Sequence, residues 1–190
     1  EAFKKGKAPK RSIVFLAVTG EEQGLLGSAY YVAYPIFNPK KSVANINIDA
    51  LDSPGKMKDL TITGFGQSEM DEYAKEAALK QNRYIIPDPV AEKGYFFRSD
   101  HFNFAKIGIP ALYASGSYEG FDKSIEEIKA YNDSYGKNKY HQPSDEYNAT
   151  TELSGVQLDL QLFFNVGSKL ANEDYFPKWY DGSEFKAARE

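Results

Sequence analysis

The stretch FLAVTGEEQGLLGS, residues 15–28, decides the fold of this 190-residue chain. Its beginning belongs to an apolar, partly β-branched run over 13–18 that lacks polar alternation, which predicts a fully buried strand. Apolar residues then recur at helical spacing over 23–34, which predicts a helix that Pro35 ends. A strand followed directly by a helix is a β–α unit, and open α/β sheets place their sites at the carboxyl ends of such strands.

Two adjacent carboxylates, Glu21 and Glu22, stand between this strand and this helix. Side chains of consecutive residues diverge, so one glutamate can hold a metal ion while its neighbour handles the proton of a water molecule. Negative side chains at a helix start also stabilise the helix dipole, by about 0.3–1 kcal/mol. The pair alone therefore leaves a catalytic role and a purely structural role open.

The composition favours a single globular domain over residues 1–190 and excludes several kinds of partner and site. The 23 basic and 27 acidic residues give a net charge of −4 and form no basic stripe, so a nucleic-acid partner is not expected. No apolar run approaches the ~20 residues of a membrane helix, so a membrane partner is not expected either. Because cysteine is absent, a metal site would have to use His, Asp and Glu.

The rest of the chain continues the alternation of strands and helices. We predict further strands over 43–50, 60–63 and 111–113, and further helices over 68–81, from 99 or 100, and from 151 or 152 to 171. The segments 82–98 and 116–150 are predicted to be loops. The second is long and rich in Gly, Tyr, Asn and Ser, which is typical of a lid or a binding loop.

Two more polar residues stand out as candidate ligands. Asp49 lies at the end of a predicted strand, and His141 lies in the long predicted loop, next to Tyr140. Only two histidines occur in the chain, and a lone histidine in a polar loop is more often solvated than ligating. Together with Glu21 and Glu22, however, these side chains form a set of oxygen and nitrogen ligands that suits zinc.

Four separated motifs resemble those of the M28 family of zinc aminopeptidases, and they occur in the same order. They are TGEEQGLLGS at 19–28, NINIDA at 45–50, RSDHFNFAKIGIPAL at 98–112 and YHQPSDE at 140–146. Four motifs in order are a far more specific signal than one, and they span most of the chain. The resemblance implies a three-layer α/β/α fold with a mostly parallel central sheet. It also implies a two-zinc exopeptidase that cleaves N-terminal residues from peptide substrates.

The resemblance also implies roles for individual residues. Glu21 matches the general base of the family. Glu22 and His141 match two ligands of one zinc ion, and Asp49 matches a ligand of the other. Tyr140 matches a tyrosine that polarises the scissile carbonyl in some members.

A further set of residues resembles the wall of the family's substrate pocket. Arg98, Asp100 and His101 belong to this set, and none of them matches a metal ligand. Family members are frequently exported, which favours an extracellular or periplasmic location.

One departure from the family pattern concerns the metal ligands. Members carry a further histidine and a bridging aspartate before the TGEE strand, and residues 1–20 contain neither. We therefore expect the C-terminal portion of a catalytic domain that is incomplete at its N-terminus, with the missing N-terminal segment as a partner. We expect it to bind zero or one zinc ion. Two alternatives stay open: a non-catalytic module that binds peptide or one weak metal, and a single-zinc glutaminyl cyclase of the same fold.

Overall fold

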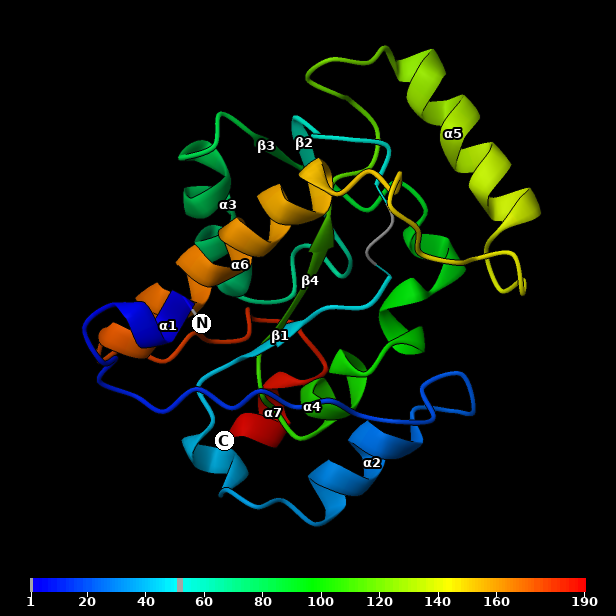
Figure 1. Cartoon of the computed structure of the whole chain (residues 1–190). Coiled ribbons are helices and arrows are strands. Elements are labelled where there is room, and N and C mark those ends of the chain that lie inside the picture. Colours follow the sequence, from blue (N-terminus) through cyan, green and yellow to red (C-terminus); the bar gives the residue numbers. More distant parts are fainter. Residues whose placement is uncertain (1, 51–52) are drawn as a thin grey trace.

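A mixed parallel and antiparallel sheet organises the computed structural model, which describes residues 2–50 and 53–190 (Figure 1). Within these residues the sheet has four strands in the order β1-β4-β2-β3. The strands are β1 Asn45–Asn47, β2 Asp59–Ile62, β3 Tyr84–Pro87 and β4 Ala111–Ser115. The pairs β1/β4 and β2/β3 are parallel, whereas β2 and β4 run antiparallel. The predicted, mostly parallel sheet of an α/β fold is therefore confirmed.

Helices cover both faces of this sheet. The longer ones are α2 Leu26–Ala33, α3 Met70–Leu79, α5 Ile125–Asn138 and α6 Ser154–Asn172. The short ones are α1 Ala2–Lys5, α4 His101–Lys106, α7 Lys186–Arg189 and the 3-10 turns Pro39–Lys41, Ala91–Lys93 and Tyr95–Arg98. No helix in the described part of the chain is long and apolar enough to cross a membrane.

The alternation of side chains along β4 explains the layers. Leu112 and Ala114 are buried in the main core, in which α3 and α6 pack on the sheet. The ring of Tyr113 lies 5.1 Å from the ring of His101 in α4. Because successive side chains of a strand point to opposite faces, α4 covers the face opposite to α3 and α6. Figure 1 shows α3 and α6 side by side on their face.

The predicted strand over 13–18 is wrong. The segment is extended, but it pairs with no strand among residues 2–50 and 53–190. Phe15 is 80% exposed and Val14 is 50% exposed, so the run is not buried. An apolar run becomes a sheet strand only where a neighbouring strand satisfies its backbone groups, and the sequence pattern does not report whether that neighbour exists.

Two elements form within segments predicted to be loops. β3 lies inside 82–98, where the two prolines of the segment suggested a loop although one of them, Pro87, only ends the strand. α5 lies inside 116–150, and Ile128 is its only buried residue. A helix with one buried residue carries no apolar stripe, so periodicity does not detect it. Its start is instead marked by a capping box between Ser124 and Glu127.

Candidate functional site

The parallel pairing of β1 with β4 brings polar groups to one edge of the sheet. Asn47 pairs with Tyr113 in the register of the two strands. Asp49 follows β1 by two residues, so it lies beyond the same edge as the end of β4. This is the carboxyl edge of both strands, where open α/β sheets place their sites.

A tight turn holds Glu21 and Glu22 before the start of α2. The backbone N–H of Leu25 donates to the carbonyl oxygen of Glu21 at 2.9 Å, which closes the turn. Gly24 has a φ of 100°, a backbone conformation that residues with a side chain rarely adopt. Leu25 has a φ of 60°, which is unusual for a leucine. Strained backbone of this kind persists only where the surroundings fix it, and it concentrates at functional sites.

Glu22 and His141 are in direct contact. Nε2 of His141 lies 2.8 Å from Oε1 of Glu22, and both side chains are more than half exposed. The ring of Tyr140 stacks on the ring of His141 with 3.9 Å between their centroids. His141 itself adopts a φ of 57°, just after the end of α5. The two residues whose motifs are furthest apart in the chain thus meet at one place.

The pKa of Glu21 is affected by several charged side chains near it. Burial raises the pKa of Glu21, and the carboxylates of Asp49, Glu22 and Asp100 raise it further, whereas His141 opposes them. Such effects require that these groups lie near Glu21. A carboxylate with a raised pKa is a better proton acceptor near neutral pH than an ordinary glutamate.

Two tyrosines border the same cluster of carboxylates. Burial raises the pKa of Tyr140, and the charges of Glu22, Asp49 and Glu21 raise it further. Burial also raises the pKa of Tyr113, with added contributions from Asp49, Tyr140 and Glu21. Both hydroxyls therefore stay protonated at neutral pH and can act as hydrogen-bond donors. Tyr113 was not predicted as a site residue, because its position within an apolar strand pattern is ordinary for a core tyrosine.

A chain of hydrogen bonds from two buried side chains, Asn47 and Ser99, ends at the carboxylate of Asp49. Oγ of Ser99 donates to Oδ2 of Asp49 at 2.5 Å, and Nδ2 of Asn47 donates to Oγ of Ser99 at 2.8 Å. Ser99 is 3% exposed and Asn47 is 9% exposed. Asn47 was not predicted as part of the site, whereas Ser99 belongs to the segment 99–101 that resembles the wall of the family's substrate pocket.

The three predicted pocket residues lie in different environments. Asp100 accepts a hydrogen bond from Ser28 at 2.5 Å, and it is near enough to Glu21 to affect its pKa. Arg98 is exposed and places its guanidinium 5.6 Å above the ring of Tyr95. His101 is fully buried, so it lies beneath the site instead of lining it. Burial lowers the pKa of His101 to about 4, although Asp49 opposes this shift.

The ligand types suit zinc, but their number is too small for a complete site. Glu22 and His141 offer one carboxylate and one imidazole, which are common zinc ligands. A catalytic zinc ion normally takes three protein ligands. Within residues 2–50 and 53–190, no three His, Asp or Glu side chains are placed to hold one ion. The pair therefore fits two positions around a zinc ion and leaves the third unfilled by these residues.

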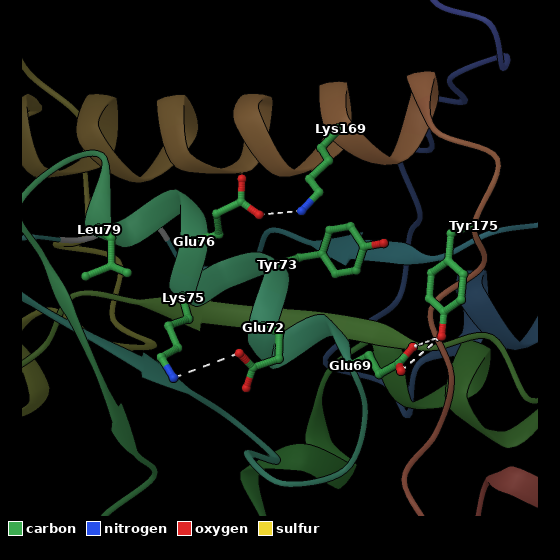
Figure 2. Close-up of a pocket in the computed structure, with 8 residues that line it drawn as sticks. All are labelled: Glu69, Glu72, Tyr73, Lys75, Glu76, Leu79, Lys169 and Tyr175. Atoms are coloured by element: carbon green, nitrogen blue, oxygen red, sulfur yellow. Dashed lines mark hydrogen bonds and ion pairs between the residues drawn. The ribbon is translucent and has the colours of Figure 1, made fainter.

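A hollow of about 450 Å³ lies elsewhere on the molecule, between α3 and α6 (Figure 2). It is lined by Glu69, Glu72, Tyr73, Lys75, Glu76, Leu79, Lys169 and Tyr175. Its charged groups bind one another, as Figure 2 shows for Lys169 with Glu76 and for Lys75 with Glu72. None of the residues predicted to form the site lines this hollow, so we do not assign the chemistry to it.

The family model described as Peptidase family M28 matches residues 1–158. No curated protein and no solved structure matches the chain.

Proposed function

Because the chain belongs to peptidase family M28, we propose that its Glu21 cluster is the site of a zinc-dependent aminopeptidase. Membership of the family suggests a zinc-dependent peptidase, and the cut at N-terminal peptide bonds is our own proposal. The observation that carries it is the 2.8 Å contact between Glu22 and His141, beside Glu21. These residues come from separate motifs, and their contact is expected if they share a metal ion.

The roles proposed for the side chains follow from their environments. Glu22 and His141 would hold one zinc ion, and Asp49 would serve a second. Zinc bound there would polarise the scissile carbonyl and lower the pKa of a water molecule. Glu21 takes the proton of the attacking water and passes it to the departing amine, a task that its raised pKa favours. The hydroxyl of Tyr140 donates to the carbonyl oxygen as negative charge develops on it.

The ligand count sets how tightly the chain binds metal. In this proposal Glu22 and His141 would give two ligands to one ion and Asp49 one ligand to the other, and no three such side chains among the described residues are placed to hold one ion. We therefore propose that the described residues bind at most one zinc ion, weakly, and that a full two-zinc centre needs ligands beyond those that residues 2–50 and 53–190 provide.

Titration calorimetry with zinc tests this assignment. Glu22→Gln and His141→Asn should each weaken binding by tenfold or more, because each removes one of two ligands. Glu126→Gln on α5 is the matched control, since it removes the same charge from the segment that carries His141 without touching the site. Equal zinc affinity in the parent chain, Glu22→Gln and His141→Asn would contradict the proposed ligands.

A second candidate function is a non-catalytic module that binds peptide or a single metal ion. The small number of ligands that residues 2–50 and 53–190 bring together favours it. Hydrolysis of leucine p-nitroanilide in excess zinc separates the two functions. In an aminopeptidase, Glu21→Gln abolishes hydrolysis and leaves zinc binding intact, because Glu21 is the base and not a ligand. Hydrolysis by the parent chain that Glu21→Gln abolishes would therefore exclude the non-catalytic module.

A further inference from the structure

A buried polar cluster lies beneath the turn that carries Glu21 and Glu22. It joins Ser28, in the first part of α2, to Asp100 and Asn103 at the start of α4. Ser28 is 0% exposed and Asn103 is 2% exposed. Neither side chain is near enough to solvent to contact substrate, so a role in the site must act through other residues.

The hydrogen bonds of this cluster use every available proton. Nδ2 of Asn103 donates to Oγ of Ser28 at 2.7 Å and to the carbonyl oxygen of Leu25 at 3.2 Å. Oγ of Ser28 donates to Oδ1 of Asp100 at 2.5 Å. An amide nitrogen carries two protons and a hydroxyl carries one, so no donor is left unpaired. A buried network in which every donor is paired favours one arrangement of its members.

The carbonyl of Leu25 connects the cluster to the site. Leu25 has a φ of 60°, a conformation that a leucine keeps only where the surroundings hold it. Its N–H donates to the carbonyl oxygen of Glu21, and its carbonyl accepts from Asn103. Leu25 is thus hydrogen-bonded to the Glu21–Glu22 turn through its N–H and to α4 through its carbonyl oxygen.

We infer that Asn103 and Ser28 are positioning residues, which hold the Glu21–Glu22 turn against α4 so that Glu22 meets His141. As far as it concerns zinc, this inference rests on the proposed function. It also gives the segment 99–103 a double task, because Ser99 in the same segment holds Asp49.

Amide hydrogen exchange tests the clamp without any metal. Ser28→Ala and Asn103→Leu remove the donors with little change in volume, and Ser28→Thr keeps the hydroxyl. The amides of 25–27 bond to Thr19, Gly20 and Glu21, so they report on the turn directly. In Ser28→Ala and Asn103→Leu these amides should exchange at least tenfold faster, whereas amides of α3 should not change. In Ser28→Thr they should stay within threefold of the parent.

Matched controls separate the clamp from general loss of packing. Ser68→Ala removes another buried hydroxyl, and Asn172→Leu removes an amide at the end of α6. Both should leave the amides of 25–27 unchanged. The inference is overturned if Ser28→Ala and Asn103→Leu also leave them unchanged. It is likewise overturned if α3 exchanges faster to the same extent, or if Ser28→Thr behaves like Ser28→Ala.

Zinc binding then tests whether the clamp serves the site. Ser28→Ala and Asn103→Leu should weaken zinc binding at least tenfold, as a misplaced Glu22 would. Faster exchange with unchanged zinc affinity would overturn the positioning role. A parent chain that binds no zinc would defeat the proposed function, whereas the exchange result would still decide whether the clamp exists.

Discussion

Oγ of Ser99 donates a 2.5 Å hydrogen bond to Oδ2 of Asp49 while it accepts one from Asn47. Ser99→Ala removes both bonds and leaves the buried amide of Asn47 without an acceptor. The expected loss of unfolding free energy is about 1–3 kcal/mol, the usual cost of an unsatisfied buried polar group. Urea unfolding measures it. Ser117→Ala, which changes an exposed hydroxyl, is the control, and an equal effect in both variants would contradict the prediction.

The buried His101 should make the protein less stable in acid. Its pKa is lowered to about 4, below the ordinary value of 6.5, so the folded state resists protonation. Its contribution to stability is therefore present above pH 6.5 and is lost as the pH falls toward 4. Between pH 7 and 4.5 this loss is about 2–3 kcal/mol. His101→Phe keeps an aromatic ring and should abolish this part of the acid sensitivity in urea unfolding at the two pH values.

Asp71 should have the opposite effect on the pH dependence of the unfolding free energy. Burial raises the pKa of Asp71 from 3.8 to about 6, and the residue is 6% exposed. The folded state thus binds the proton more tightly than the unfolded chain, so this contribution is largest below pH 3.8 and is lost as the pH rises through 6. Lowering the pH from 7 to 4.5 should gain about 2 kcal/mol from Asp71 alone.

The variant Asp71→Asn removes the ionisable carboxyl and so tests the contribution of Asp71 to the pH dependence of stability. The asparagine keeps an acceptor for the N–H of Gly66, which donates to Asp71 at 2.7 Å. The variant should be more stable than the parent at pH 7, and this advantage should shrink at pH 4.5. A constant difference in unfolding free energy at both pH values would rule out a perturbed carboxyl at this position.

The residues proposed for the site stand out in the sequence, whereas the residues that support them do not. Asp49 follows a segment whose pattern marks the end of a strand, and the parallel pairing of β1 with β4 brings such ends to one edge of the sheet. Glu22 stands out in the sequence through the carboxylate pair that it forms with Glu21. Ser99 and Asn103 each act through two side-chain hydrogen bonds, which no hydrophobic pattern reports. Their partners are distant in sequence, so only the folded arrangement identifies them.

The same contrast holds for the fold. Leu162 and Val166 belong to the apolar stripe that predicted α6, and both are buried. The run around Phe15 has an equally apolar pattern but no partner strand in the described part of the chain, and α5 has a helical backbone but only Ile128 to bury. Local pattern gives the propensity of a segment, whereas burial depends on what lies next to it.

A buried ion pair between α6 and the start of β3 gives a further stability prediction. Nη1 of Arg83 lies 2.6 Å from Oδ1 of Asp159, and the arginine side chain is 1% exposed. Asp159→Asn would leave a buried guanidinium without its counter-charge, which costs about 3–5 kcal/mol. The double variant Arg83→Met/Asp159→Leu should recover most of this loss, because it removes both charges. If the double variant is as unstable as Asp159→Asn, the unpaired charge is not the cause.

The exposed run over 13–18 can be tested against the core with one matched pair of substitutions. Phe15→Ala and Phe163→Ala delete the same side chain, but Phe15 is 80% exposed and Phe163 is 6% exposed. Phe163→Ala should lower the unfolding free energy by about 3–5 kcal/mol through lost burial and the cavity that it leaves. Phe15→Ala should change it by at most about 0.5 kcal/mol, as is usual for surface substitutions. Urea unfolding compares the two, and a loss of several kcal/mol in Phe15→Ala would show that this run is buried in solution.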